Sequence, residues 1–247
     1  MHGVKRKVKT LLARWGYRVQ GTRFVPRQLL DPALARPLEL ADVVSRLMVE
    51  QGPELAFVQV GAFDGVTKDP LYVFIGKHGW RGVMLEPQPG PAAQLRQLYR
   101  DNERITVMEA VIDAQRGERT LFMVESDTVP VWARGMASFS RDHIAKHDYL
   151  IPGIEAIIRE IRVPAVTFDD VLTKLGGERI DVLQIDAEGA DAYILSLLPL
   201  ARVRPAIIHW EVKNLTMAQR EASLELLARA GYRFAPSGDE DMLAVLG

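Results

Sequence analysis

The chain has 247 residues, 48% of them hydrophobic and 26% charged, with a formal net charge of -1 and no cysteine. This composition is typical of a globular protein with a sizeable core, and it disfavours a general nucleic-acid binder, which would carry a strongly basic patch. No apolar run approaches the roughly 20 residues that cross a bilayer and no secretory signal is visible, so we expect a cytoplasmic protein.

The N-terminal segment is strongly basic. Before the first acid, Asp31, the cationic residues are Lys5, Arg6, Lys7, Lys9, Arg14, Arg18, Arg23 and Arg27. Apolar residues at helical spacing predict an amphipathic helix; they are Val4, Val8, Leu11, Leu12 and Trp15. We favour docking of this helix on its own domain over contact of residues 1–27 with a membrane surface, because so short an apolar stripe more often packs on protein. A linker over 26–37 and a helix over 38–49 complete a predicted basic helical extension, residues 1–52.

From residue 53 the sequence alternates between short apolar runs and helical patterns. Strands are predicted over 55–61, 82–86, 105–112, 181–186 and 205–211. Helices are predicted near 70–78 and over 90–100, 190–198 and 217–230, and a hairpin is predicted from Arg233 to Leu246. Such alternation is typical of βαβ units that build a parallel sheet. We therefore predict one α/β domain over residues 53–247.

One interval breaks this alternation. Glu118 to Glu125 reads as an extra strand, and Thr128 to Gly153 is irregular, with proline and glycine at both ends. Long irregular segments inside a compact domain are usually lids or binding loops. We therefore predict a lid insertion at about 126–160 that contacts the substrate.

The first predicted strand ends in a glycine turn, VQVGAFDG at 58–65. The next strand ends in Glu86, and an acid there can accept hydrogen bonds from both hydroxyls of a ribose. A dinucleotide site would have G-x-G-x-x-G, but Phe63 stands where its second glycine would be, and Asp64 would repel a pyrophosphate. Asp64 suits an amino group or a sulfonium, which favours S-adenosylmethionine. A plain surface turn, whose glycines adopt positive φ, is the alternative.

With Glu86 in place, the chain resembles the FkbM family of S-adenosylmethionine-dependent methyltransferases from about Phe57 to the C-terminus. The segments that carry the resemblance are QVGAFDGVTKDPL at 59–71, WRGVMLEPQP at 80–89, EAVID at 109–113, GMASFSRDHIAKH at 135–147, VPAVTFDDVL at 163–172, IDVLQIDAEGAD at 180–191 and IIHWEVKNL at 207–215. It implies a Rossmann-like class I fold, with a mostly parallel seven-stranded sheet and helices on both faces. It also implies O-methylation of a hydroxyl on a sugar, polysaccharide or natural product.

The resemblance implies cofactor contacts residue by residue. Those in the first turn and the strand before it are Gln59, Gly61, Ala62, Asp64 and Gly65, of which Gly61, Asp64 and Gly65 would line the methionine part. Glu86 would hold the ribose. Those on the adenine side are Ile112, Asp113 and Ser138. Phe63 departs from the family, which usually has asparagine at this position.

Two later strand ends carry ionisable residues that should face the cofactor's methyl group. They are Asp186 and Glu188 after the fourth strand, and His209 and Glu211 at the end of the fifth. A hydroxyl acceptor must lose its proton to a base. We predict that Asp186 is this base or orients it, and that Glu188, His209 and Glu211 shape the acceptor site. Two alternatives stay open: Glu188 caps the following helix, or His209 is a core histidine.

A metal ion is a second means of activating a hydroxyl. Asp186 with Glu211 or Asn214 could hold Mg²⁺, since oxygen ligands suit that ion, although no tight ligand motif is present.

The insertion contains a mostly cationic polar cluster: Ser138, Arg141, His143, Lys146 and His147. A lid that recognises an anionic or sugar-like substrate competes with a solvated loop as its interpretation. His143 and His147 can share a helical face, but no third zinc ligand is near. Two other functions remain as alternatives: an NAD(P)-dependent oxidoreductase, which Phe63 and Asp64 disfavour, and a non-catalytic cofactor-binding or membrane-associated accessory protein that acts through its basic N-terminus.

Overall fold

The computed structural model describes residues 17–20, 23–26 and 38–247. The predicted amphipathic helix from Val4 to Trp15 lies outside the described residues, as does residue range 27–37 of the predicted linker. Strands β1 (Tyr17–Gln20) and β2 (Arg23–Pro26) pair antiparallel, so this part of the predicted helical extension is a hairpin. Within the described ranges, no helix is long and apolar enough to cross a membrane.

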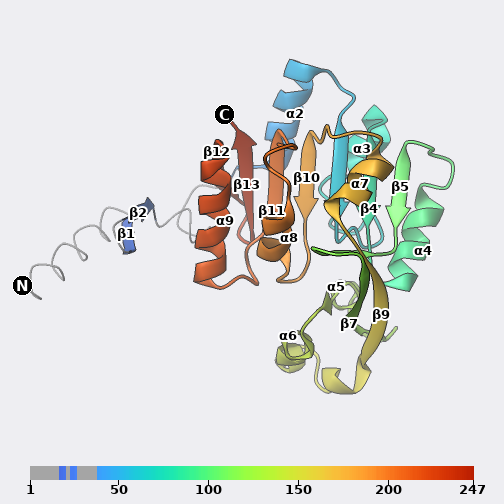
Figure 1. Cartoon of the computed structure of the whole chain (residues 1–247). Helices are drawn as coiled ribbons and strands as arrows, with labels where there is room; N and C mark the ends of the chain where they lie inside the picture. Colours follow the sequence, from blue (N-terminus) through green and yellow to red (C-terminus); the bar gives the residue numbers. More distant parts are fainter. Residues whose placement is uncertain (1–16, 21–22, 27–37) are drawn as a thin grey trace, which may run out of the picture.

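A seven-stranded sheet forms the centre of the protein (Figure 1). Its strands are β3 (Ala56–Val60), β4 (Arg81–Leu85), β5 (Ile105–Met108), β10 (Val182–Ile185), β11 (Ile207–Glu211), β12 (Tyr232–Ser237) and β13 (Asp241–Leu246). They lie in the order β12-β13-β11-β10-β3-β4-β5. β13 runs against the other six, pairing antiparallel with both of its neighbours, β11 and β12. The predicted seven-stranded, mostly parallel sheet is therefore confirmed.

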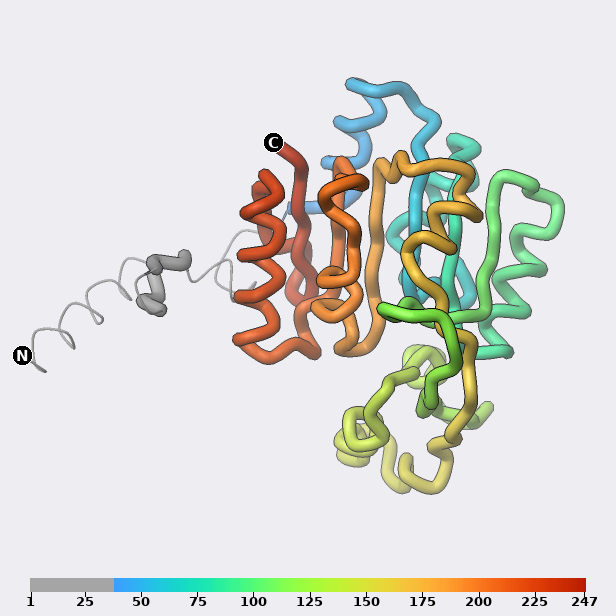
Figure 2. The backbone as a smooth tube through the Cα atoms, in the orientation of Figure 1, coloured from blue at the N-terminus to red at the C-terminus, as the bar shows by residue number. Residues whose placement is uncertain are grey.

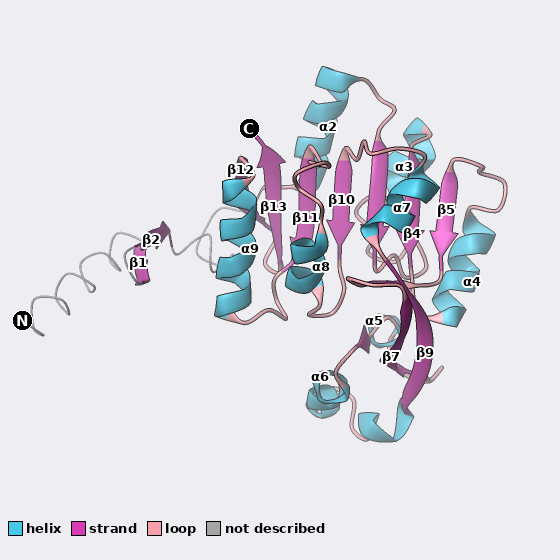
Figure 3. Cartoon of the chain, in the orientation of Figure 1, coloured by secondary structure: helices cyan, strands magenta, loops and turns pink. Residues whose placement is uncertain are grey.

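Helices cover both faces of this sheet (Figure 3). One face carries α2 (Leu40–Gln51), α3 (Tyr72–His78) and α4 (Pro89–Leu98), and the other carries α7 (Phe168–Leu175), α8 (Asp191–Leu197) and α9 (Met217–Arg229). Successive residues of a strand point to opposite faces. Phe57 of β3 accordingly packs with the first group of helices, whereas Val58 and Val60 pack with the second.

Helix α2 belongs to the core of this domain. Its Leu40, Val44 and Leu47 are buried in the same apolar cluster as residues of β3, β4, β11 and β13. A boundary between residues 52 and 53, as drawn from the sequence, would divide that cluster. The packed unit therefore begins at α2, because the first face of the sheet would lose part of its cover without it.

Between β5 and α7 the chain builds a second sheet of four strands, in the order β6-β9-β7-β8. Its elements are β6 (Val111–Ile112), β7 (Gly117–Val124), α5 (Val131–Arg134), β8 (Ala137–Ser138), α6 (Arg141–Ala145), η3 (Lys146–Tyr149), η4 (Ile154–Ile157) and β9 (Ile158–Val166). β7 confirms the predicted extra strand. The segment predicted as irregular has instead an apolar cluster of its own, which includes Val124, Ile144 and Ile154.

The insertion projects from the edge of the main sheet at which the parallel strands end (Figures 1 and 2). The strand order reverses beside β3: the chain runs outward through β4 to β5 and later returns to β10 on the other side of β3. In open α/β sheets, ligands bind outside the carboxyl ends of the strands at such a switch point. There the fold brings together the glycine turn, Asp186 and the insertion.

Candidate functional site

The glycine turn leaves β3 directly beside the end of β10. Gly61 has a φ of 77°, and a Cβ atom at this position would lie 1.8 Å from the carbonyl oxygen of Asp186. The N–H groups of Gly61 and Ala62 donate to the carbonyl oxygen of Leu85, at 2.9 and 3.1 Å. Glycine is therefore required at position 61 both by the backbone conformation and by the close approach of a second backbone.

The carboxylate of Asp64 stabilises the turn itself. It accepts hydrogen bonds from the backbone N–H groups of Val66 and Thr67 and from the Thr67 hydroxyl, at 2.9, 2.7 and 2.7 Å. Burial acts to raise the pKa of Asp64, but these hydrogen bonds lower it below its usual value. Gly65 packs on α4, where a Cβ atom would lie 2.5 Å from Leu95 Cδ1. Neither Asp64 nor Gly65 is among the described residues that line the cavities below.

Glu86 follows β4 and points its carboxylate at the same turn. Its two oxygens accept hydrogen bonds from the backbone N–H groups of Phe63 and Gln88, both at 2.8 Å. Burial raises the pKa of Glu86 to about 7. Each carboxylate oxygen has a second lone pair, so Glu86 can still accept hydrogen bonds from the hydroxyls of a ligand.

Two adjoining cavities open at this edge of the sheet. The smaller has a mostly apolar lining, and the larger has a more polar lining. The residues that line both are Gly61, Glu86, Gly135, Asp186 and Glu188. The glycine turn, two strand ends and the insertion thus meet where the cavities join.

The smaller cavity contains two of the residues predicted for the adenine side, Ile112 and Ser138. The third, Asp113, does not line it. The Asp113 carboxylate instead contacts the Arg119 guanidinium and accepts a hydrogen bond from the Tyr193 hydroxyl at 2.6 Å. Arg119 holds the pKa of Asp113 well below its usual range. The structure thus gives Asp113 a role in holding the insertion's first turn rather than a free carboxylate for a ligand.

Asp186 follows β10 and lines both cavities. Its side chain is exposed to them, yet the surrounding walls displace much of its hydration. This desolvation, together with the negative charges of Glu188 and Glu240, raises the pKa of Asp186 to about 6. At neutral pH Asp186 is therefore an ionised carboxylate that can take up a proton at modest cost.

The loop after Asp186 is shaped by Asp191, a residue for which no role is predicted from the sequence. Asp191 is fully buried and accepts hydrogen bonds from the N–H groups of Ala187 and Gly189, at 3.3 and 3.2 Å. Glu188, inside this loop, has a φ of 48°. A non-glycine residue in that region costs roughly 1–3 kcal/mol, so the loop is held against strain. The sequence signal for Asp191 is an acid in the first turn of the helix that follows the loop.

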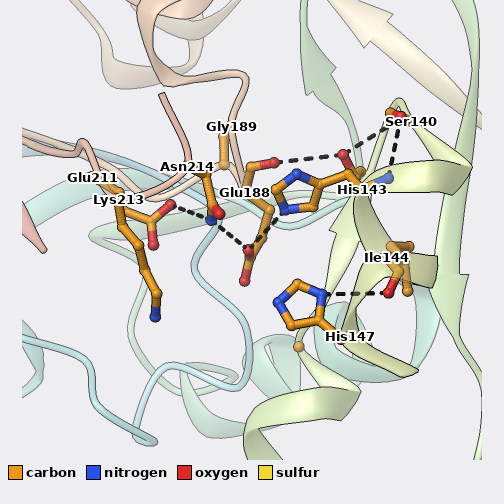
Figure 4. A network of polar contacts seen from close by, with 12 residues as sticks. Ser140, His143, Ile144, His147, Glu188, Gly189, Glu211, Lys213 and Asn214 are labelled. Atoms are coloured by element: carbon orange, nitrogen blue, oxygen red, sulfur yellow. Dashed lines mark hydrogen bonds and ion pairs between the residues drawn. The ribbon is translucent and has the colours of Figure 1, made fainter. Parts of the chain in front are cut away.

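Glu188 joins a polar network between the main sheet and the insertion (Figure 4). Asn214 Nδ2 donates to Glu188 Oε2 at 3.1 Å and to Glu211 Oε2 at 2.9 Å. From the insertion, His143 Nε2 lies 3.8 Å from Glu188 Oε2. The alternative role of Glu188 as a helix cap is not seen, because Ala190 is the N-cap residue of α8 and no side chain caps it.

The residues predicted to hold Mg²⁺ do not fit a metal. Asn214 meets both carboxylates with its amide nitrogen, a donor that cannot ligate a cation. In the part of the chain that the structure describes, no group of three or more His, Cys, Asp or Glu residues is placed for metal binding. We therefore derive no step through a metal ion.

His209 is buried in β11 and lies outside both cavity linings. Its Nδ1 donates to Gln184 Oε1 at 2.6 Å, and burial lowers its pKa to about 4, so the ring is neutral near pH 7. This placement agrees with the alternative of a core histidine. An effect of His209 on the acceptor site would have to act through Gln184, which lines the larger cavity.

The insertion supplies an aromatic wall of the larger cavity. Trp132 and Tyr149 line it and are 40% and 78% exposed, and His147 lines it beside them. Of the predicted cationic cluster, Arg141, His143 and Lys146 are absent from both linings. The main sheet and the loops that follow its strands supply polar side chains to the same lining, so the cavity offers both apolar and polar contacts to a ligand.

The stability of the ligand-free protein is expected to fall between pH 7 and pH 9 because of Glu211. Burial and the charges of Asp186 and Glu188 raise the pKa of Glu211 from 4.5 to about 9. Between those values the folded state binds one more proton than the unfolded chain, so stability falls by about 1.4 kcal/mol per pH unit and stops falling above pH 9. Urea unfolding at pH 7, 8 and 9 should show a smaller decline for Glu211→Gln, whose amide oxygen can still accept from Asn214. Equal declines in the two proteins would contradict this assignment.

The fold and the site together define a class of protein: the chain has the Rossmann-like fold of class I methyltransferases. A crystal structure of methyltransferase FkbM from Methylobacillus flagellatus KT aligns with a TM-score of 0.50 and 15% identity, over 78% of this chain and 44% of that chain. The likeness at this identity shows the fold, and this chain matches less than half of the length of that protein. The family model described as "Methyltransferase FkbM domain" matches residues 59–234. The chain therefore belongs to the FkbM methyltransferase domain family.

Other solved methyltransferases are more distantly similar. An O-methyltransferase from Bacillus cereus in complex with SAH aligns with a TM-score of 0.43 and 13% identity, over 97% of this chain and 89% of that chain. Aeropyrum pernix fibrillarin with bound S-adenosyl-L-methionine aligns with a TM-score of 0.41 and 12% identity, over 93% and 81% of the two chains. These similarities are too weak to indicate which ligands this chain binds. No curated protein sequence matches the chain.

Proposed function

We propose that this protein binds S-adenosylmethionine at the switch point and transfers its methyl group to a hydroxyl of a small-molecule or carbohydrate acceptor. The observation that carries the proposal is the pair of cavities that join at Gly61, Glu86 and Asp186. The cofactor has an apolar planar base, a ribose diol and a charged amino-acid end, in that order. The apolar cavity, Glu86 and the polar cavity follow the same order.

Each part of the cofactor has a matching wall in this arrangement. The base fits the smaller cavity between Pro87, Ile112 and Ile194, and the ribose hydroxyls can donate to Glu86. The amino-acid end would then extend along the glycine turn into the larger cavity. The sulfonium would lie near Asp186, because this acid lines both cavities.

The reaction is an in-line displacement. The acceptor oxygen forms a bond to the methyl carbon as the bond from that carbon to sulfur breaks, and the sulfonium becomes a neutral sulfide. The acceptor's proton passes to Asp186, whose pKa of about 6 leaves it ionised at neutral pH. Holding the oxygen, carbon and sulfur in line supplies much of the rate, and the walls of the larger cavity serve this purpose.

The larger cavity supports a sugar-like acceptor. Trp132 and Tyr149 contribute aromatic surface from the insertion, while Gln184, Glu211 and Asn214 contribute polar groups to the same lining. A sugar ring presents C–H groups on its faces and hydroxyls at its edge, so it can contact both kinds of surface. A screen of hydroxylated acceptors with a labelled methyl donor tests this part of the proposal.

Glu86→Gln is expected to weaken the binding of S-adenosylmethionine and S-adenosylhomocysteine about 10- to 100-fold, because one of the two oxygens that can accept from the ribose hydroxyls is lost. Titration calorimetry of the full chain measures both affinities. Glu125→Gln, which removes an exposed acid paired with Arg159 outside both cavities, is the control and should bind like the wild type. Wild-type affinity in Glu86→Gln would place the ribose elsewhere, and a wild-type protein that binds neither ligand would refute the proposed function.

A further inference from the structure

The larger cavity contains two buried oxygen atoms that have no hydrogen-bond donor among the residues that the structure describes. Gln59 of β3 is 3% exposed, and its Oε1 is buried without a partner. The Oδ2 atom of Asp69, in the segment before α3, is also buried without a partner. Both residues line the cavity. A buried acceptor without a donor costs about 1–3 kcal/mol, so the two oxygens point to a donor that a ligand brings.

The other carboxylate oxygen of Asp69 is already used by the fold. Oδ1 accepts hydrogen bonds from the backbone N–H groups of Leu71 and Tyr72, at 2.7 and 3.1 Å, where α3 begins. These contacts fix the carboxylate plane beside the cavity. Burial raises the pKa of Asp69, although the Leu71 N–H and the Gln59 amide offset part of this effect. A cation bound at Oδ2 would compensate for the same burial.

We infer that Asp69 and Gln59 form a cation subsite for the α-ammonium group of the cofactor's amino-acid end, with Asp69 providing the charge and Gln59 the second acceptor. This inference rests on the proposed function and deepens it. It assigns the contact to Asp69 in place of Asp64, whose carboxylate already accepts three hydrogen bonds within its own turn.

The chemistry of the two orphaned oxygens selects an ammonium group over the other groups that the reaction brings. A sulfonium carries a positive charge but no N–H or O–H, so it would leave the amide oxygen of Gln59 without a donor. An acceptor hydroxyl can donate to Gln59 but leaves the charge of Asp69 uncompensated. An ammonium group has three donors and a positive charge, and it satisfies both atoms.

The test is a calorimetric titration of the full chain and of Asp69→Asn with three probes: S-adenosylmethionine, S-adenosylhomocysteine and 5′-methylthioadenosine, which lacks the amino-acid end. Asparagine keeps an oxygen for the N–H groups of Leu71 and Tyr72, so α3 can still begin there. We expect the first two probes to bind about 10- to 100-fold more weakly and the third to bind as it does to the wild type. Gln59→Leu should weaken the same two probes by a smaller factor, and it keeps the test decisive if Asp69→Asn does not fold.

Asp170→Asn is the matched control, because Asp170 also accepts a backbone N–H at the start of a helix but lies outside both cavities. It should bind all three probes like the wild type. Unchanged affinities in Asp69→Asn, an equal loss for all three probes, or a loss for S-adenosylmethionine alone would each overturn the inference; the last would assign Asp69 to the sulfonium. A wild-type protein that binds the third probe but neither of the first two would also overturn it, whereas one that binds none of them would reject the proposed function itself.

Discussion

Gly61→Ala is expected to destabilise the protein by about 3 kcal/mol or more and to abolish the binding of S-adenosylmethionine. A left-handed backbone costs roughly 1–2 kcal/mol for a residue with a Cβ atom. The larger cost is steric, because the new atom would lie 1.8 Å from the Asp186 carbonyl oxygen, and that oxygen belongs to a backbone held by β10. To relieve the clash, β3 and β10 must separate at the point where the two cavities join. Urea unfolding and calorimetry measure the two effects.

Gly176→Ala separates the strain from the clash. Gly176 ends α7 with a φ of 78°, almost the same as that of Gly61, but a Cβ atom there would have no neighbour within 4 Å. This variant should lose only the roughly 1–2 kcal/mol of backbone strain and should keep wild-type affinity for the cofactor. If both variants lost the same stability and both bound the cofactor, the close approach at Gly61 would not be what positions the site.

The location of the site could be predicted from the sequence because strand ends are easy to recognise. In a parallel sheet the carboxyl ends of all strands lie at one edge, so an apolar run that ends in Glu86 and another that ends in Asp186 must bring these two acids to the same side. The structure has both residues in the wall that the two cavities share. The apolar runs and the turn residues that follow them are therefore enough to predict where the site lies.

The use of each acid could not be predicted in the same way. Asp64 and Asp69 stand five positions apart in one turn, and the sequence favours Asp64 because it lies between the two glycines. Which of them faces the cavity depends on where the backbone N–H groups of the turn point, and two of these bind Oδ1 of Asp64. The role of Asp113 could not be predicted for a similar reason. Its partner Arg119 lies beyond the short connection between β6 and β7, and the sequence does not show that the two side chains meet.

Two parts of the fold were missed for different reasons. The start of helix α7 carries a recognisable sequence signal, because Thr167 and Asp170 form a capping box. The strand before it, β9, is not predicted from the sequence, so the βα unit to which the helix belongs was missed. The insertion was predicted as an irregular lid because its helices are short, and short helices carry little periodicity. Its order comes from contacts such as those between Val124, Ile144 and Ile154, which are distant in sequence.

Asp186→Asn is expected to reduce methyl transfer by about 10²- to 10⁴-fold, the range that a general base contributes, while affinity for S-adenosylhomocysteine stays within a few-fold. Asparagine has nearly the same shape but cannot accept the acceptor's proton. The rate of the wild-type protein should rise with pH through about 6 and then level off, because the pKa of Asp186 lies there. In the variant this rise should disappear. The measurement is the pH profile of transfer to the acceptor that the labelled-methyl screen identifies.

Glu188→Gln distinguishes the two acids after β10 that line both cavities, Asp186 and Glu188. Glu188 lines both cavities, as Asp186 does, but it is held by Asn214 at 3.1 Å, and glutamine can still accept that hydrogen bond. We expect this variant to retain the pH profile of the wild type and to change mainly the KM for the acceptor, because Glu188 shapes the acceptor site without taking its proton. A loss of the pH-dependent rise in Glu188→Gln, with full turnover in Asp186→Asn, would move the base to Glu188. If EDTA stopped the wild-type reaction and Mg²⁺ restored it, the proton would instead leave an acceptor bound to a metal, and the base role of Asp186 would fall.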